Sequence, residues 1–206
     1  YWRYVLLSLR PEGGDVNFKL DLFIEKVNND LNNVIGNLVN RSIVCFERFC
    51  NGRLESPPEV DGDCKRFIES ALERHDGIAS LYEDFRIQRA VKETLYQAEE
   101  GNRFLNEKEP WKLFKEDPPK AVSVVYSLLR LIRVLAVELY PIMPSTSEIL
   151  WKNLSEHEPI LSTGWDGVKS DFKYPLNIKR FPPIFRKLSK EEVLSTLERF
   201  RSGGGS

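Results

Sequence analysis

The sequence predicts an all-α protein, a helical bundle of about five long helices followed by an extended segment and a short C-terminal helix. Two observations predict this fold. Apolar residues recur at three- and four-residue steps through most of the chain, which is helical spacing, and no stretch shows strand alternation or an internal repeat. The 206 residues are 41% hydrophobic and 30% charged, the composition of a globular protein that can bury a core without disulfides.

The first long helix is predicted to begin near Leu20, because apolar residues then follow at helical steps as far as Phe49. Asn51-Gly52 ends it, since both residues tolerate the left-handed conformation that closes many helices. A loop rich in proline and acidic residues follows.

Two further helices are predicted before Pro110. Asp63 is the expected N-cap of the first, and its inward face is expected to hold the following residues: Phe67, Ile68, Ala71, Leu72, His75, Ile78, Ala79 and Tyr82. The second pattern runs from Phe85 to Leu105, and Pro110 breaks it. His75 falls on an apolar face, so we expect a packed, hydrogen-bonded core residue rather than a catalyst.

The stretch from Ala121 to Leu139 is the most apolar part of the chain, but Arg130, Arg133 and Glu138 interrupt it. A membrane span would carry few or no charges. We therefore expect a helix in the middle of the bundle, contacted on most sides by its neighbours, and no membrane partner.

Beyond Pro144 the sequence predicts one more helix of the bundle, an extended segment and a short terminal helix. Ser145 and Glu148 have the spacing of a capping box that opens the first of these. From residue 161 the helical pattern gives way to Gly, Pro and aromatic residues, which we expect to wrap over the bundle because aromatic side chains need burial. A second capping box, Ser189 with Glu192, opens a helix over 191–200, and 201–206 is expected to be a flexible Gly/Ser tail.

Composition and motifs exclude several classes of function. Lys and Arg number 30 against 31 Asp and Glu, so any nucleic-acid site must be a local patch. The three cysteines form no C-x-x-C pair, and their odd number argues against a disulfide framework, which favours a reducing cytoplasm. No glycine-rich phosphate loop, nucleophile elbow or zinc-protease motif occurs, so neither a catalytic residue nor a metal ligand is predicted.

The first helix carries a stripe of polar residues that the core does not require. Asn33, Asn37 and Arg41 follow at four-residue steps, and Arg48 extends the line. Asn is a poor helix former, whereas Asn and Arg side chains match the hydrogen-bonding edges of nucleobases in single-stranded RNA. The stripe is therefore a candidate RNA contact, and the alternative is an ordinary solvated helix face.

Trp111 is the candidate partner of this stripe. It follows Pro110 at a helix terminus, where an indole held by a rigid turn offers a platform on which an unpaired base can stack. Pro110 itself and the nearby Lys112 and Lys115 are candidates for flanking or phosphate contacts. The alternative is that Trp111 only holds two helices together, and spacing alone does not decide between the two.

Several segments carry a resemblance to a known family. They are residues 36–41 (GNLVNR), 98–111 (AEEGNRFLNEKEPW) and 139–144 (LYPIMP). These resemble, in the same order, three motifs of the anticodon-binding domain of methionyl-tRNA synthetases: GN-[LV]-x-x-R, A-E-x-x-N-R-[YF]-[IL]-x-x-x-x-P-W and L-x-P-[FI]-M-P. Residues 1–18 are similar to the stretch that follows the last signature of the catalytic domain in that family.

The resemblance implies a function and its residues. Asn37 and Arg41 match the family's anticodon-reading Asn and Arg, and Trp111 matches the Trp on which the first anticodon base stacks. The implied ligand is the CAU anticodon of methionine tRNAs, initiator and elongator. The implied organisation is a remnant of the link from the catalytic domain (1–17), the helical anticodon-binding domain (18–160), and a C-terminal segment that folds back on the bundle (161–200).

The chain also departs from the family. The two ATP-binding signatures and the zinc-knuckle cysteines of methionyl-tRNA synthetases do not occur in it. We therefore expect no ligase activity from this chain alone, with ATP and zinc confined to a catalytic part that is joined in cis or supplied as a separate chain. The start without Met and the Gly/Ser end favour an excised domain over half of a split enzyme.

Two alternatives stay open at this point. The chain is the anticodon-binding domain of another class I synthetase, such as the cysteine or isoleucine enzyme, or it is a helical interaction module with no RNA role.

Overall fold

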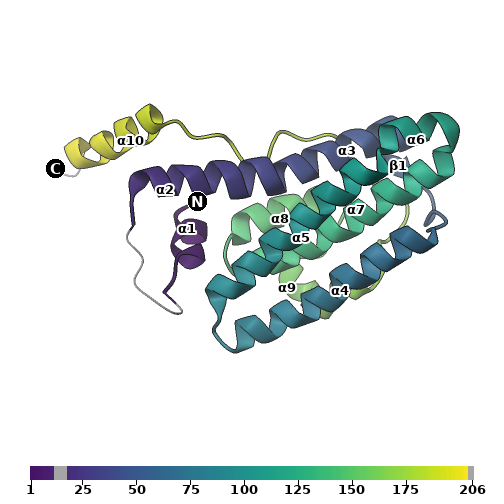
Figure 1. Ribbon diagram of the computed structural model, residues 1–206, viewed down its shortest axis with the longest axis horizontal. Helices are drawn as coiled ribbons and strands as arrows, with labels where there is room; N and C mark the ends of the chain where they lie inside the picture. The colour runs from purple at the N-terminus through teal and green to yellow at the C-terminus, as the bar shows by residue number, and fades with distance from the viewer. Residues whose placement is uncertain (12–17, 204–206) are drawn as a thin grey trace.

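The structure is a computed structural model that describes residues 1–11 and 18–203, with side chains to residue 199. The described part is a helical bundle with a long C-terminal segment laid along its outside (Figure 1). In chain order the elements are α1 (Trp2–Ser8), α2 (Leu20–Lys26), η1 (Val27–Gly36), α3 (Asn37–Cys50), β1 (Arg53–Leu54), α4 (Gly62–Glu83), α5 (Ile87–Lys108), α6 (Pro110–Glu116), α7 (Pro118–Leu139), α8 (Pro144–Asn153), α9 (Ile160–Thr163), η2 (Asp166–Lys169), β2 (Leu176–Asn177) and α10 (Lys190–Gly203).

The predicted first helix is present as one continuous rod made of α2, η1 and α3. Its backbone stays helical at both junctions, and it ends at Asn51 in the left-handed conformation (φ 50°), as predicted. The middle part, η1, is π-helical, which three- and four-residue spacing does not predict. Helical segments of this kind are rare and frequently mark functional sites.

Helix α7 forms the centre of the bundle, as predicted. Every residue from Ala121 to Leu139 other than Val122 is buried, and α7 packs against α3, α4, α5, α6 and α8. The close approach of α5 depends on Gly101, because a Cβ there would stand 2.6 Å from Leu131 of α7 and 2.8 Å from Leu38 of α3. Among the described residues no helix is long and apolar enough to cross a membrane.

The two buried arginines of α7 have partners in the chain that follows α8. Arg133 donates to the carboxylate of Glu156 and to the backbone carbonyl of Ser170 (2.7 Å). Arg130 donates to Asp171 (3.3 Å) and to the carbonyl of Val168 (3.2 Å). These bonds fasten the chain after α9 to the bundle.

Several predicted helix starts are wrong in detail. Asp61, and not Asp63, caps α4, because its side chain accepts the backbone N–H of Cys64 (2.8 Å). The predicted capping box of Ser145 does not form, since α8 begins directly at Pro144, whose fixed φ suits the first helical position. Phe85 is 73% exposed in the α4–α5 turn instead of lying in the core.

The second predicted capping box is confirmed. The Ser189 hydroxyl accepts from the N–H of Glu192, and the Glu192 carboxylate accepts from the N–H of Ser189, each at 3.2 Å. The helix that they open, α10, extends to Gly203, so residues 201–203 of the expected tail are helical and 204–206 lie outside the described residues.

The segment between α8 and α10 contains more structure than the extended chain that the sequence predicts. It includes α9, η2 and β2, and β2 pairs antiparallel with β1, joining Leu176 to Leu54. Phe172 is buried, and Trp165 and Phe181 are half-buried against the core, so the expected burial of the aromatic residues is confirmed.

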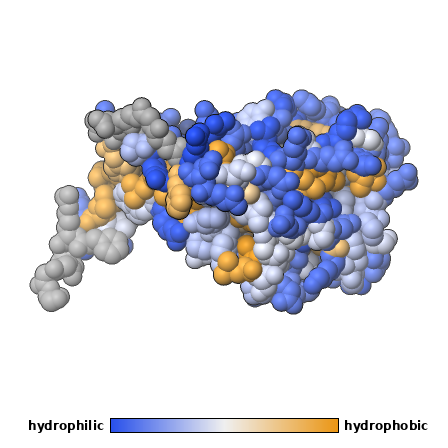
Figure 2. Space-filling view, turned by 90° about the horizontal axis from the view of Figure 1, so that it is seen from below, coloured by the Kyte–Doolittle hydropathy of each residue, from blue (hydrophilic) through white to orange (hydrophobic). Residues whose placement is uncertain are grey.

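The N-terminal segment forms α1, which packs on α5 with Tyr4 and Val5 buried. The same end of the molecule exposes apolar side chains: Trp2 is 45% exposed, Leu6 54% and Phe18 40%. Figure 2 shows that hydrophobic residues gather at this end, next to the residues drawn in grey, while most of the visible bundle is hydrophilic.

Candidate nucleic-acid interface

The polar stripe predicted from the sequence lies on an open face of the long helix. We call Asn33, Asn37, Arg41 and Arg48 the ridge. Asn33, Asn37 and Arg48 are exposed, and Arg41 is half-buried. Asn33 lies in η1 and the other three lie on α3, so one continuous helical rod presents all four.

Helix α5 lies beside the ridge and meets it with two asparagines. Asn37 donates its side-chain amide to Asn102 (3.3 Å), and Arg41 donates to Asn106 (2.8 Å). Asn102 in turn donates to the backbone carbonyls of Val34 (2.9 Å) and Ala98 (3.1 Å), which fixes its orientation. The two helices run in the same direction here. Asn37 and Arg41, four residues apart on α3, therefore meet Asn102 and Asn106, four residues apart on α5.

Between the two helices lies a shallow, open groove of about 530 Å³. Its lining is polar on both sides and consists of the following residues: Asn33, Val34, Asn37, Arg41, Glu99, Asn102, Arg103, Asn106 and Glu107. Glu100 pairs with Arg103 and raises the pKa of its guanidinium. The groove thus presents amides, guanidinium groups and carboxylates on its surface, several of them hydrogen-bonded or ion-paired to one another.

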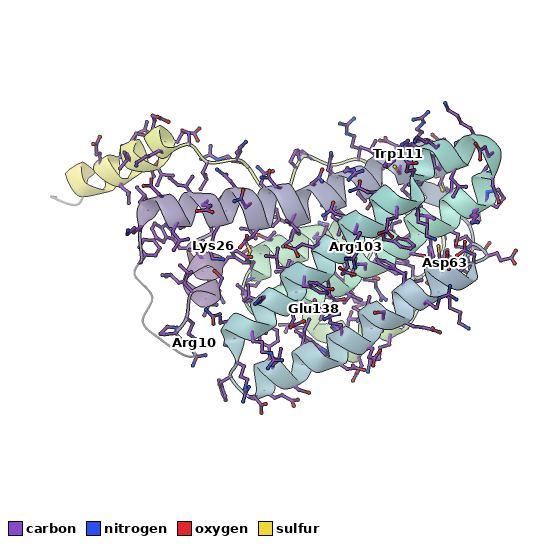
Figure 3. The ribbon with its side chains drawn as sticks, in the orientation of Figure 1. Arg10, Lys26, Asp63, Arg103, Trp111 and Glu138 are labelled. Atoms are coloured by element: carbon purple, nitrogen blue, oxygen red, sulfur yellow. The ribbon has the colours of Figure 1, made fainter. Side chains whose placement is uncertain are left out.

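Trp111 reaches the same face from α6. The Arg41 guanidinium carbon lies 5.3 Å from the centroid of the indole ring, within the range of a cation–π contact. The indole is half-buried and packs against the core, so it is held in place without being enclosed. Figure 3 shows Trp111 at the end of the bundle where α3 and α6 meet.

A tight turn between α5 and α6 fixes the position of this indole. Helix α5 ends at Lys108, and Glu109 adopts the left-handed conformation (φ 41°), which redirects the chain into α6. Pro110 opens α6 and is buried. A second anchor is the stacking of Phe114 on Phe49 of α3, with ring centroids 4.2 Å apart.

The flanking candidates divide into two kinds. Pro110 is buried, so it supports Trp111 and offers little surface of its own. Lys112 is exposed but pairs with Glu109 (2.8 Å), and Asn33 donates to Asn29 (3.3 Å). Arg48 and Lys115 are exposed and have no carboxylate partner among the residues that the structure describes.

Sequence reasoning missed Asn102 and Asn106 as part of this site. The signal was available, because the two asparagines lie four residues apart on one helix, as Asn37 and Arg41 do. Their pairing with the ridge was not available, because which helix faces α3 is decided by the packing of the bundle.

His75 is a structural residue, as predicted. Its ring is fully buried, with Nδ1 at 3.0 Å from Glu138 Oε1 and Nε2 at 3.0 Å from the backbone carbonyl of Trp165, on which it also stacks. Within the described residues no group of three or more His, Cys, Asp or Glu is arranged to hold a metal ion. The arrangement on α3, α5 and α6 is suited to binding a flat, polar ligand.

Comparisons with known proteins agree with this geometry. Residues 60–204 match the family model described as the anticodon binding domain of methionyl tRNA ligase, and residues 1–43 match the model of class I tRNA synthetases for methionine. A methionine–tRNA ligase of Thermofilum pendens is 34% identical over 97% of this chain, and one of Sulfolobus acidocaldarius is 34% identical over 98%. The chain spans 35% and 36% of those two relatives, about a third of their length.

Solved structures show the same fold. The free form of Mycobacterium tuberculosis methionyl-tRNA synthetase superposes with a TM-score of 0.82 at 20% identity, covering 91% of this chain and 38% of that one. The family match excludes the cysteine and isoleucine enzymes and the helical interaction module as alternatives. This chain belongs to the family of anticodon-binding domains of methionyl-tRNA ligases.

Proposed function

We propose that the chain binds the anticodon loop of methionine tRNAs, initiator and elongator, on the face formed by α3, α5 and α6. The supporting observation is that Arg41, Asn37 and Trp111, which come from two helices far apart in sequence, meet on one open surface. Unpaired bases of RNA loops are recognised by stacking on aromatic rings and by hydrogen bonds to their edges. The face offers both kinds of contact, since the groove supplies polar groups and Trp111 lies beside Arg41 at the edge of that groove.

Each side chain has a distinct role in this proposal. Trp111 supplies the face on which one unstacked base lies, a contact worth about 1 to 3 kcal/mol. Arg41 presents the paired donors of its guanidinium to a carbonyl and ring nitrogen, and Asn37 presents one donor and one acceptor to an amide-like edge. In the free chain Arg41 lies over the indole, so we infer that it moves aside or shares the stack when RNA binds.

The proposed sequence preference is CAU, and a direct titration tests it. The chain is titrated against stem-loop RNAs that differ only in the anticodon, with fluorescence anisotropy of labelled RNA as the readout. We expect CAU to bind more tightly than loops with one changed base, by about 1 to 3 kcal/mol for each lost contact to a base edge. Equal affinity for all loops contradicts the proposal.

Two ridge substitutions and a control substitution identify the surface that produces the preference for CAU. Asn37→Ala and Arg41→Ala are expected to reduce the discrimination between CAU and other loops, because they remove groups that touch base edges. Lys92→Ala, an exposed substitution elsewhere on α5, is the matched control and should leave discrimination unchanged. A preference for CAU that survives both ridge substitutions would move the site to another face.

We further propose that the domain serves a larger ligase, in which a catalytic part attaches methionine to tRNA at the expense of ATP. Support comes from the relatives, of which this chain spans about a third, and from the class I synthetase match at residues 1–43. The apolar end formed by Trp2, Leu6 and Phe18 is the proposed contact with that catalytic part. ATP and any zinc belong to the catalytic part in this proposal, and the three cysteines, all free, are compatible with the cytoplasm.

The proposed contact can be tested with a catalytic part supplied as a separate chain. We expect this chain to bind it and Trp2→Ala with Leu6→Ala to weaken binding, while binding of CAU stem-loops by the variant stays unchanged. If the double variant binds the catalytic part as tightly as the original chain, the apolar end is not the contact.

A further inference from the structure

Residues 178–188, which we call the strap, run along the outside of the long helix in the opposite direction to it. At one end Ile178 donates its backbone N–H to the carbonyl of Gly52, just beyond α3 (2.9 Å). At the other end Leu188 exchanges two hydrogen bonds with the side chain of Asn28 in η1 (2.8 and 2.9 Å). Figure 1 shows this part of the chain passing along the outer side of α3 toward α10.

The middle of the strap is packed on the helix and is therefore fixed relative to the ridge. Phe181 to Ile184 share a small pocket with Gly36, Val39, Asn40 and Ile43. Phe185 is buried, and its ring lies next to Gly36, since a Cβ built on that glycine would be 3.4 Å from the ring.

The strap and α5 lie on opposite flanks of the ridge. Residues of an α-helix advance by about 100° each, so Asn37, Arg41 and Arg48 occupy one narrow sector of α3. On one side of this sector Asn102, Asn106 and Trp111 make their contacts. On the other side Asn40, three residues from Asn37 and its neighbour on the helix surface, touches the strap.

The strap is strongly basic. It holds Lys179, Arg180, Arg186 and Lys187 and no Asp or Glu. All four side chains are exposed, and none has a carboxylate partner among the residues that the structure describes. By contrast, Lys112 and Arg103 near the groove are paired with neighbouring carboxylates. Helix α3, on which the strap packs, contains one carboxylate, Glu47, and two arginines, Arg41 and Arg48.

We propose that Lys179 and Arg180 bind phosphates of the RNA backbone beside the ridge. The two residues follow Ile178 and precede Phe181, so they lie along the C-terminal half of α3, next to the ridge where Arg41 and Arg48 project. This inference rests on the proposed function, since it takes an RNA loop on the ridge as its starting point. Bases are then read from one flank of α3 and the backbone is held from the other, a division common in nucleic-acid recognition.

The test compares two double variants that each remove two positive charges. Lys179→Ala/Arg180→Ala changes the strap, and Arg86→Ala/Arg89→Ala changes exposed arginines at the α4–α5 turn and start of α5, away from the ridge. Both are titrated with a CAU stem-loop and a UAC stem-loop from 50 to 200 mM KCl, and circular dichroism checks that both fold. Lys179→Arg/Arg180→Lys keeps the charges and serves as the rescue variant.

We expect the strap variant to bind both RNAs more weakly at low salt, by the same factor of about three to ten, because phosphate contacts carry no sequence information. The slope of log K against log salt should fall by roughly 0.7 to 0.9 for each lost phosphate contact. The α4–α5 variant and the rescue variant should keep the original slope.

The outcomes separate this proposal from the proposed function. An unchanged slope in the strap variant, or an equal change in the α4–α5 variant, overturns the role of the strap. Loss of the CAU preference in the strap variant also overturns it, because the residues would then touch bases. If the original chain binds CAU and UAC equally while the strap variant still loses slope, the phosphate contact stands and the proposed anticodon specificity falls.

Discussion

The buried cluster of Arg130, Arg133 and Glu156 and the ridge on α3 both contain arginine side chains, with opposite results. In the cluster the guanidinium of Arg133 is enclosed between the rings of Trp151 and Phe172, with its carbon at 5.2 and 5.4 Å from their centroids. On the ridge the guanidinium of Arg41 has one ring, one amide and open solvent around it.

The difference lies in how completely each charge is satisfied. Arg133 meets a carboxylate and two backbone carbonyls, and its side chain is 4% exposed. Such a group is too costly to leave unpaired, so its partners are fixed by the fold. The contacts of Arg41 are exchangeable for those of a ligand at little cost, which is the property a binding surface needs.

The largest expected effect comes from breaking the buried cluster. Arg133→Ala leaves the Glu156 carboxylate buried without its partner, and the free energy of unfolding should fall by about 3 to 5 kcal/mol. Urea unfolding followed by circular dichroism measures this. Replacing both partners, Arg133→Met with Glu156→Leu, should recover most of the loss, and a double variant as unstable as the single one would show that lost packing, not the unpaired charge, is the cause.

Trp111→Ala is expected to affect RNA binding more than folding. The affinity for a CAU stem-loop should fall by about 1 to 3 kcal/mol, because one base loses its stacking surface. Trp111→Phe keeps an aromatic face and should retain part of the affinity. If both variants bind RNA as tightly as the original chain, the indole only joins α6 to the bundle. The comparison of the buried arginine cluster with the ridge would then say nothing about RNA binding.

A smaller effect is expected from Asn106→Ala. The substitution removes the acceptor that orients Arg41 (2.8 Å), and RNA affinity should weaken by about 0.5 to 1.5 kcal/mol because the guanidinium is no longer preorganised. Isothermal titration calorimetry would measure the change, and Asn106→Asp keeps the acceptor oxygens as a comparison. Tighter RNA binding by the alanine variant would mean that the hydrogen bond from Arg41 to Asn106 competes with the contact between Arg41 and RNA.

The smallest expected effect is a pH dependence inside the bundle. Burial raises the pKa of Glu138 above its ordinary value of 4.5, although hydrogen bonds from His75 and Gln97 oppose the shift. A carboxyl group with a raised pKa in the folded state takes up its proton more readily there than in the unfolded chain, so its contribution to stability falls as pH rises.

This sign gives a measurable comparison. The stability of the original chain relative to Glu138→Gln should decrease as pH rises from 4.5 through the raised folded-state pKa. Urea midpoints of both proteins at pH 4, 5 and 7 test it. A difference that stays constant with pH would mean that the pKa of Glu138 is the same in the folded and the unfolded chain, and a difference that grows as pH rises would mean that the folded state lowers this pKa.

Much of the fold could be predicted from the sequence because it depends on local chemistry. The end of the long helix at Asn51, the break before Pro110 and the box of Ser189 with Glu192 are each set by a few neighbouring residues, and each is confirmed. The central place of α7 followed from its nearly continuous apolar surface, which only contacts on all sides can bury.

Errors occurred where local signals compete. Asp61 and Asp63 are both suitable N-caps, and the choice was decided by the way the loop before α4 reaches Ser123 of α7, whose hydroxyl accepts the N–H of Asp61 (3.3 Å). The π-helical turn geometry of η1 likewise leaves no mark in a pattern of three- and four-residue steps.

The sequence by itself determined which residues are available for recognition: an asparagine-rich helix with Arg41 and a tryptophan after a proline. Only the tertiary structure decided that Asn106 and Trp111 come to Arg41 and that the basic strap packs on the other flank of the long helix. The physical reason is that helix spacing specifies a face of a single helix, whereas the partners of that face are selected by close packing of the whole core, including the glycine at 101 that lets α5 approach.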